Sequence, residues 1–389
     1  LNNGVLQVTV GRKRFRLFDQ VILDSNGNGQ FEPDDTLAPD ESLIRAVATD
    51  GPYWVNAEGK AFRAAFDPSP LVRVEESGPL RVTLRADGWL TAEDGARAGR
   101  FVTRISLCAG QTQIAVNSTF IITWDTADRA MRVRDMGVAV TPVGLEKAQL
   151  ARYTEAVPLP EEGTFYMLAD RWNRVLVGES PADRIRAARS GDPLRYDRSN
   201  FLNWRVPLWF GAFGKNGGVA LHQRYMAEKF PKEIEVGRGT LTWHAWPKHG
   251  TETWTTGTDL SDFVNMRWLH QGKLLDFQIP PDYFKALEGF RALTPNTRVT
   301  MLIYGDRSYY GSGTAISGEL TYYFSPETRD INAFNAFVDP KAAAFDAAPH
   351  AVADARWAAD SRVLELVTPM EPQYPDIEKG VSKAFDATM

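Results

Sequence analysis

The chain has 389 residues, 43% hydrophobic and 24% charged, so it can bury a substantial core as one large or two ordinary domains. Its 44 Lys and Arg residues against 49 Asp and Glu residues give a mildly acidic balance, which indicates no nucleic-acid partner and no anionic membrane. The lone cysteine, Cys108, excludes internal disulfide bonds and cysteine-based metal clusters, and no apolar run approaches the roughly 20 residues of a membrane span.

Short β-strand patterns dominate the chain from its start. Between residues 72 and 84, apolar side chains alternate with charged ones, the two-residue period of a half-buried strand. Similar runs recur at residues 5–10, 15–23, 101–107, 112–123, 131–140, 164–178, 206–221, 240–246, 273–278, 298–304 and 315–323. Helical patterns are fewer, at residues 222–230, 260–271, 281–292, 332–345 and 351–359.

A sheet with one apolar face must cover that face with another layer. The pattern therefore predicts a mainly β fold, a large antiparallel β-sandwich (supersandwich-like) with a few short helices and a helical C-terminal tail. We expect the sandwich at residues 1–330, with a calcium-type loop at 24–35. Residues 331–389, where alanine becomes frequent, are expected to form a helical linker toward a missing C-terminal domain.

Residues 24–35 have the ligand spacing of a twelve-residue calcium loop. Side-chain oxygens stand at loop positions 1, 3, 5, 9 and 12, position 7 offers its backbone carbonyl, and Gly29 stands at the sharp turn. The alternative is a polar Asn-Gly turn between strands. We expect Ca²⁺ in a structural role, with these ligands: Asp24, Asn26, Asn28, Gln30, Glu32 and Asp35.

Tryptophan is concentrated between residues 204 and 268. Flat amphipathic rings stack on sugar faces, so a groove of such side chains would suit a carbohydrate. Packing in the core of the sandwich is the alternative for each ring. The candidate substrate-binding residues are Trp209, Trp246 and Trp268.

Histidine is concentrated in the same stretch, where His222, His244, His249 and His270 stand. Each one alone has a structural alternative, but together with Arg224, Tyr225, Lys229 and Lys248 they form a plausible acid–base set. Phosphate-loop, zinc-helix and serine-elbow motifs are absent from the sequence. Acidic residues are scattered, so a glycosidase carboxylate pair cannot be selected.

Several segments, in this order, resemble the exo-rhamnogalacturonan lyase-like (YetA-like) family. They are residues 75–82, 86–89, 104–110, 217–225, 230–232, 246–250 and 269–274. The resemblance covers about residues 1–330 and implies the central β-sandwich of such proteins, without their N-terminal RIFT barrel and C-terminal α/α toroid.

The resemblance implies a polysaccharide lyase that acts on rhamnose- and uronate-containing glycans by β-elimination. His222, His249 or His270 would then be the base and Tyr225 the acid, while Arg224 would clamp the uronate carboxylate. Three alternatives stay open: a non-catalytic, calcium-dependent carbohydrate-binding module, a glycoside hydrolase, and a structural surface or adhesion domain. The expected partners are a poly- or oligosaccharide and flanking domains of the same parent chain, and the expected location is secreted or periplasmic.

Overall fold

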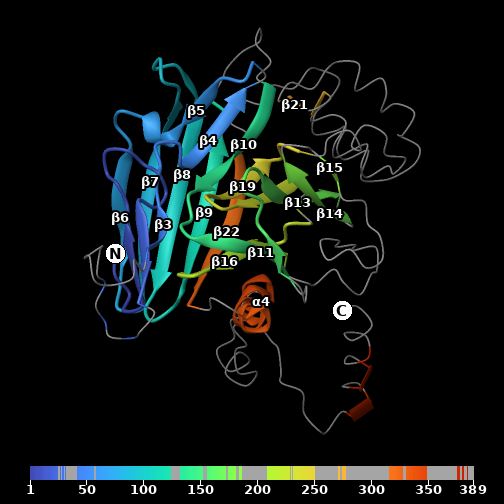
Figure 1. The fold of residues 1–389 in the computed structure, drawn as a ribbon. Helices are drawn as coiled ribbons and strands as arrows, with labels where there is room; N and C mark the ends of the chain where they lie inside the picture. Colours follow the sequence, from blue (N-terminus) through green and yellow to red (C-terminus); the bar gives the residue numbers. More distant parts are fainter. Residues whose placement is uncertain are drawn as a thin grey trace. The chain divides into compact units, whose positions relative to one another are not determined.

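The protein is mainly β, as predicted, and every strand pair in the part of the chain that the structure describes is antiparallel (Figure 1). The computed structural model describes residues 1–24, 27, 29, 31, 42–56, 58–123, 132–151, 156–171, 174–180, 184–185, 208–227, 229, 231–249, 270–271, 274–276, 315–326, 330–347, 375–376, 379–380 and 383.

The first strands are short, and some later ones reach a dozen residues. In chain order they are β1 (Leu6–Thr9), β2 (Gln20–Leu23), β3 (Ser42–Arg45), β4 (Gly51–Asn56), β5 (Ala61–Arg63), β6 (Leu71–Ser77), β7 (Arg81–Thr91), β8 (Arg97–Cys108), β9 (Gln113–Ile121), β10 (Arg132–Val140), β11 (Leu145–Leu150), β12 (Val157–Pro158), β13 (Thr164–Arg171), β14 (Arg174–Ser180), β15 (Arg184–Ile185), β16 (Trp209–Gly214), β17 (Gly217–Gln223), β18 (Lys232–Gly237), β19 (Thr240–Trp246), β20 (His270–Gln271), β21 (Leu274–Asp276) and β22 (Ala315–Ser325). A 3-10 turn spans Ala64–Phe66, and helix α4 spans Ile331–Ala347.

Two runs of neighbouring strands form the sandwich. One run is ordered β4–β10–β19–β18–β13–β14, and the other is ordered β6–β7–β8–β9–β22–β17–β16–β11. Trp243 of the first run stacks on Phe120 of the second, with ring centroids 6.4 Å apart. A Cβ atom added at Gly318 would clash with the Trp243 ring, so glycine there lets the two runs approach.

Strand β18 is buried on both of its faces. Ile234 and Val236 point into the apolar core, and the alternation along a strand sends Glu233 and Glu235 to the opposite face. In the neighbouring β19, Trp243 joins the same core. Two adjacent strands therefore carry polar side chains on a common face that is itself covered.

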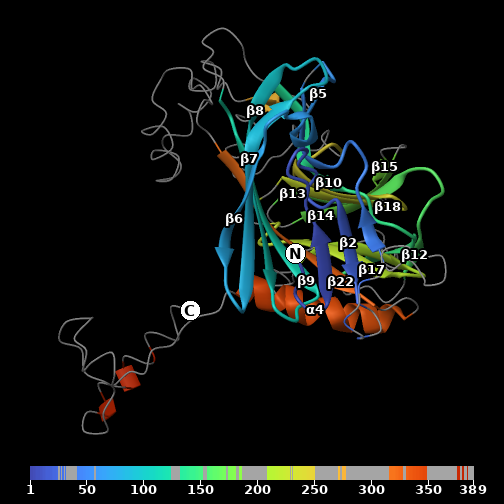
Figure 2. The same ribbon diagram turned by 90° about the vertical axis from the view of Figure 1, so that its left-hand side faces the viewer.

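Helix α4 packs its apolar stripe on the second run of strands, which confirms the helix predicted at 332–345. Phe334, Val338 and Ala342 recur every four residues and are buried against Trp209, Phe213 and Tyr323. Figures 1 and 2 show the helix lying across one end of the sheets. The burial of this stripe fastens the helix to β16, β17 and β22.

Three other local predictions differ from the structure. Residues 222–230 are not a helix, because β17 continues to Gln223 and a turn follows. The runs 164–178 and 206–221 each contain two antiparallel strands rather than one. The predicted segments 281–292, 298–304 and 351–359 lie outside the described residues, as does most of 260–271.

The chain divides into two compact units, Leu1–Asp346 and Ala347–Met389. Within the described residues, none of the helices has the length and hydropathy needed to cross a membrane.

Candidate functional site

Buried polar side chains meet on the common face of four neighbouring strands. Tyr53 comes from β4, Asp135 from β10, His244 from β19, and Glu233 and Glu235 from β18. The register sets them side by side, because residue 137 of β10 pairs with both Tyr53 and His244, and His244 pairs with Glu233. We call these five residues the His244 cluster.

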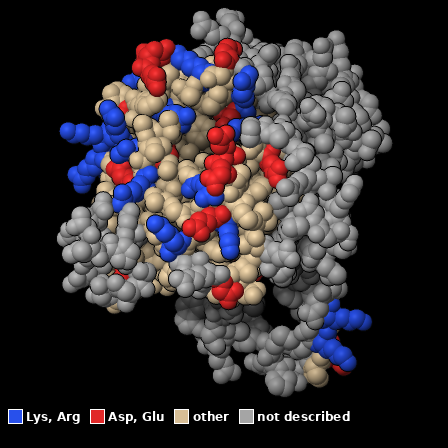
Figure 3. All heavy atoms as spheres, viewed as in Figure 1, with Lys and Arg blue, Asp and Glu red and all other residues tan. Residues whose placement is uncertain are grey.

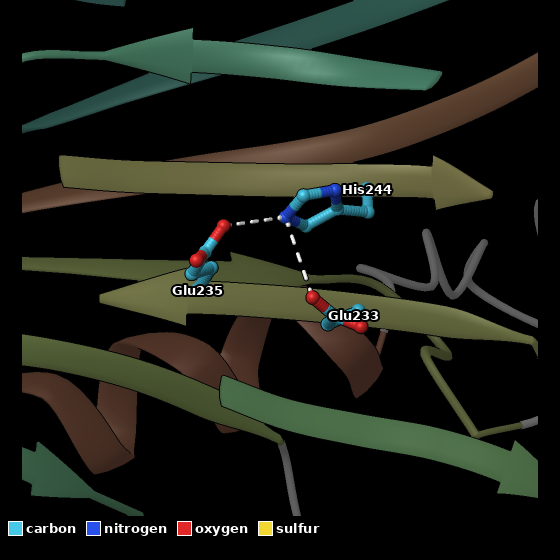
Figure 4. Close-up of side chains that lie close together, drawn as sticks. All are labelled: Glu233, Glu235 and His244. Atoms are coloured by element: carbon cyan, nitrogen blue, oxygen red, sulfur yellow. Dashed lines mark hydrogen bonds and ion pairs between the residues drawn. The ribbon is translucent and has the colours of Figure 1, made fainter. Parts of the chain in front are cut away.

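The imidazole of His244 is held by carboxylates at both ring nitrogens. Figure 4 shows the two glutamates that meet at one of these nitrogens. Its Nδ1 lies 2.7 Å from Oδ1 of Asp135. Its Nε2 lies 3.2 Å from Oε2 of Glu235 and 3.4 Å from Oε1 of Glu233. The Tyr53 hydroxyl donates to Asp135 at 3.0 Å and so fixes the carboxylate behind the ring.

Each glutamate of the cluster is also held from outside it. His249 lies with Nδ1 2.7 Å from Oε1 of Glu233, and its backbone N–H donates to Oε2 at 3.1 Å. The His249 ring stacks on Tyr166, with centroids 4.1 Å apart and planes 3° apart. Glu235 accepts from the Thr164 hydroxyl at 2.5 Å and from Nζ of Lys248 at 3.3 Å. The positions of both carboxylates are therefore fixed in advance of any ligand.

The cluster is covered except beside Lys248. His244 is 1% exposed and Glu233 is fully buried, whereas the Lys248 side chain is 46% exposed. Burial of charge is costly unless the charges compensate one another. Here the three carboxylates of Asp135, Glu233 and Glu235 contact two imidazoles, those of His244 and His249, and the ammonium group of Lys248.

Ionisation in the cluster is governed by these neighbours. Burial alone would lower the pKa of His244, but the charges of Asp135 and Glu233 outweigh it and raise that pKa well above its ordinary value. Burial would likewise raise the pKa of Glu235, yet the hydrogen bond and charge of His244 leave it lowered. The pKa of Tyr53 is raised well above its ordinary value by burial and by Asp135. The phenol therefore remains a donor at neutral pH.

Glu233, Glu235 and His244 have the composition and spacing of a metal-ligand set. One ligand atom from each lies within 4.8 Å of the others, and within the described residues this is the single group of three or more such side chains. Imidazole with carboxylates suits divalent transition cations such as Zn²⁺, Mn²⁺ or Fe²⁺. Three protein ligands would leave coordination positions open for water or a substrate oxygen.

The residues predicted to be catalytic divide between two places. His249 lies beside the His244 cluster, and His270 lies in β20, with its side chain outside what the structure describes. His222, Arg224 and Tyr225 instead lie together at the end of α4. Nε2 of the fully buried His222 is 3.2 Å from a carboxylate oxygen of Asp346, and the Tyr225 hydroxyl donates to the Asp346 carbonyl at 2.8 Å.

Arg224 completes this contact with the helix. Its guanidinium group pairs with Glu319 at 3.0 Å and lies over the rings of Tyr225 and Phe345. These contacts fasten α4 to β17 and β22.

The predicted sugar-stacking tryptophans that the structure describes are buried. Trp209 is fully buried and its Nε1 donates to Asp339 of α4 at 2.8 Å, and Trp246 is 3% exposed. Trp268 lies outside the described residues. Within the described part of the chain, these two rings serve the core rather than a surface platform.

The calcium loop stays a prediction. The Asp24 carboxylate accepts from the backbone N–H groups of Gly27 and Gly29, each at 2.8 Å, which closes the start of the loop. The other predicted ligands, Asn26, Asn28, Gln30, Glu32 and Asp35, lie outside the described residues.

Sequence reasoning missed most of the His244 cluster. Tyr53, Asp135, Glu233 and Glu235 were not among the candidates, although His244 was noted. One signal was available in residues 233–236, where Glu alternates with Ile and Val. Two acids spaced by two residues in a strand must share a face, and the flanking apolar residues show that the strand is buried.

The sequence matches no model of a known protein family, and it matches no curated protein. Several solved structures are similar at low identity. A proposed aldose 1-epimerase from Klebsiella pneumoniae is 9% identical, with a TM-score of 0.36, over 88% of this chain and 81% of the other. A galactose mutarotase related enzyme from Lactobacillus acidophilus is 9% identical, with a TM-score of 0.34, over 85% and 98%. An aldose epimerase homologue from C. elegans is 10% identical, with a TM-score of 0.30, over 84% and 97%.

The predicted membership of the exo-rhamnogalacturonan lyase-like family is wrong. No family model or curated protein supports it, and the similar solved structures carry the names of sugar epimerases rather than lyases. The predicted β-elimination activity, and its alternatives of a calcium-dependent binding module or a glycoside hydrolase, are corrected with it. Short motifs such as residues 217–225 misled because they serve strand pairing and helix docking.

Proposed function

We propose that the protein is a metal-dependent enzyme that acts on a sugar or a related polyol, with a divalent cation held by His244, Glu233 and Glu235. The observation that carries the proposal is the spacing at Nε2 of His244, which lies 3.2 and 3.4 Å from oxygens of two different glutamates. Charge-assisted N–H···O hydrogen bonds are usually about 2.7–2.9 Å long, so the hydrogen bond between Nε2 and Glu235 is a long one. A tetrahedral cation with ligands at about 2.0–2.2 Å sets its ligand atoms about 3.3–3.6 Å apart.

The groups behind the ligands support the same proposal. Metal-binding histidines usually donate their second ring nitrogen to a carboxylate, and ligating carboxylates are themselves hydrogen-bonded. Asp135 occupies that place behind His244. His249 backs Glu233, and Thr164 backs Glu235. All three ligands are thus oriented by a second group.

A cation here would supply Lewis-acid chemistry at its open positions. It would polarise a hydroxyl or carbonyl oxygen of the substrate, or lower the pKa of a bound water. Substrate would enter beside Lys248, the exposed member of the site. Aldohexoses are the first substrates to test, since the similar solved structures carry the names of aldose epimerases.

Metal binding tests the proposal directly. Purified protein stripped of metal would be titrated with Zn²⁺, Mn²⁺ and Co²⁺ by calorimetry, and the visible spectrum of the Co²⁺ form would report the coordination geometry. We expect one cation per chain, lost in Glu233→Gln and Glu235→Gln and kept in Glu161→Gln, a matched control at a carboxylate 87% exposed. A wild-type protein that takes up no divalent cation would overturn the proposal.

Activity is measured separately. Metal-loaded and metal-stripped protein would be incubated with aldoses, and the interconversion of anomers and epimers followed by NMR. We expect faster conversion with the metal-loaded form only. A bound cation without conversion of any aldose would refute the sugar substrate and leave the metal site standing.

A further inference from the structure

The outward face of β6, β7 and β8 presents arginines in a cross-strand row. Arg73 pairs with Arg85, and Arg85 pairs with Arg104. Neighbouring strands are about 4.8 Å apart, so three guanidinium groups start from backbone positions within about 10 Å. Like charges directly opposite one another destabilise a sheet. Anions between or above the arginines would therefore stabilise such a row.

The protein supplies some of these anions itself. Glu75 contacts Arg104 at 2.5 and 3.0 Å and lies 3.5 Å from Arg85. Asp87 contacts Arg85 at 3.1 Å and lies 3.7 Å from Arg100. These two carboxylates do not balance the arginines of the face.

Two further arginines are held at the end of the same face by one aromatic ring. The guanidinium groups of Arg97 and Arg100 lie 5.1 and 5.6 Å from the centre of the Trp89 ring. Cation–π contact fixes the plane of a guanidinium group and leaves its N–H edge free for an incoming anion. Trp89 thereby reduces the ordering that anion binding would require.

The local charge contrasts with that of the whole protein. Five arginines (73, 85, 97, 100 and 104) and two acids (75 and 87) give 5 − 2 = +3 on this face, in a chain whose net charge is −5. The neighbouring Arg81–Glu76 pair adds no net charge. Figure 3 shows Lys and Arg side chains gathered at the left-hand edge of the molecule, where β6 and β7 lie.

The face continues onto β9 through Asn117 and Thr119, and Glu319, the partner of Asn117 in β22, is paired with Arg224 and Lys229. Asn117 of β9 pairs with Arg104, and Thr119 beside it shares a hydroxyl–hydroxyl contact of 2.8 Å with Ser317 of β22. Hydroxyl and amide groups of this kind suit the hydroxyls of a sugar. The face thus offers anion contacts and sugar-hydroxyl contacts side by side.

We propose that this face binds an acidic polysaccharide, with carboxylate or sulfate groups on Arg73, Arg97 and Arg100. A nucleic acid fits less well, because proteins that bind it typically contact about 6–10 phosphates and carry a strongly basic domain. This chain has an isoelectric point of about 5.7. The proposal uses none of the residues of the His244 cluster and stands or falls independently of the proposed function.

The test measures binding of the protein to soluble polymers in low salt, by affinity electrophoresis and by calorimetry. The probes are polygalacturonate, dextran sulfate, uncharged dextran and double-stranded DNA. We expect the two acidic polysaccharides to bind, uncharged dextran not to bind, and affinity to fall as salt rises. The triple variant Arg73→Gln/Arg97→Gln/Arg100→Gln should weaken binding at least about tenfold, which corresponds to about 1.4 kcal/mol.

Arg238→Gln is the matched control, since Arg238 is an exposed arginine (42%) in the β18–β19 turn, away from this face. It should bind as the wild type does, and circular dichroism should show that all variants are folded. Failure of the wild type to bind either acidic polysaccharide overturns the proposal. Equal binding by the triple variant, or tighter binding of DNA than of the polysaccharides, overturns it as well.

Discussion

The carboxylate of Asp135 lies 2.7 Å from Nδ1 of His244, on the side of the ring opposite to Glu233 and Glu235. The two residues come from adjacent strands yet are separated by 109 positions in sequence. This contact fixes which ring nitrogen faces the glutamates. It thereby decides how the proposed cation would be bound.

Asp135→Asn tests that role. The amide keeps the shape of the side chain but loses the charge that orients the ring, so we expect cation affinity to fall about 10–100-fold. Calorimetric titration with Zn²⁺ measures the change. Tyr53→Phe, which removes a donor to Asp135, should have a smaller effect. Unchanged affinity in Asp135→Asn would show that the contact has no part in binding a cation.

Lys248→Gln should raise the cation affinity, whereas Asp135→Asn should lower it. The Lys248 ammonium lies 3.3 Å from a Glu235 oxygen and competes electrostatically with a cation at the same carboxylate. Because this side chain is 46% exposed, screening keeps the effect small, and we expect cation affinity to rise about two- to fivefold. The same titration measures it, and a loss of affinity would contradict the competition.

Phe334→Ala should detach α4 from the sheet. Phe334 is fully buried and contacts the rings of Trp209 and Phe213. Removing a buried phenyl ring costs about 3–5 kcal/mol of unfolding free energy. Urea unfolding would measure that loss of unfolding free energy. Asn332→Ala, at the exposed start of the helix, is the control that should change little.

Glu319 should make the stability of the folded protein depend on pH in a direction that its contacts define. Burial would raise its pKa, but the Arg224 and Lys229 contacts lower it below the ordinary value of 4.5. A lowered folded-state pKa contributes stability that is present above pH 4.5 and lost as the pH falls through the folded-state pKa. The side chain is 39% exposed, so we expect less than about 1 kcal/mol.

The measurement is thermal unfolding of the wild type and Glu319→Gln across acidic pH. The difference in Tm between the two proteins should be constant above pH 4.5 and shrink below it. A difference that grows as the pH falls would contradict the assigned sign.

The calcium loop has a test of its own. Ca²⁺ should raise the Tm of the wild type, and Tb³⁺ should bind with sensitised luminescence, both effects being lost in Asp24→Ala. Asp94→Asn changes an exposed acid elsewhere and should keep both effects. Full Tb³⁺ binding in Asp24→Ala would remove Asp24 from the ligand set.

The parts of the fold that the sequence predicted are those with local signals. Apolar and polar residues alternate along β7, β8 and β9. In α4, Phe334, Val338 and Ala342 follow one another at a spacing of four residues. The hairpin within 164–178 was missed although Asp170, Arg171 and Arg174 interrupt its apolar runs where the chain reverses. Local patterns report exposure along a strand but not which strands become neighbours.

The candidate site could not be predicted from local patterns, because they do not show which strands pair. Tyr53 reaches His244 across 191 positions of sequence, and no residue near either one signals the contact. His222 and Tyr225, predicted to be catalytic from their residue types, both contact Asp346 at the end of α4, and their catalytic roles stay predictions. Residues that are far apart in sequence can share a site, because strand pairing decides which side chains become neighbours.

The position of β6 at the edge of its sheet affects whether copies of the protein aggregate. Among the described strands it pairs along its length with β7 alone, and Leu71 and Val74 on it are 49% and 52% exposed. An open, partly apolar strand edge is a template for aggregation unless charge interrupts it. Arg73 and Glu75 provide that interruption, so Arg73, which would contact the polymer, also serves solubility.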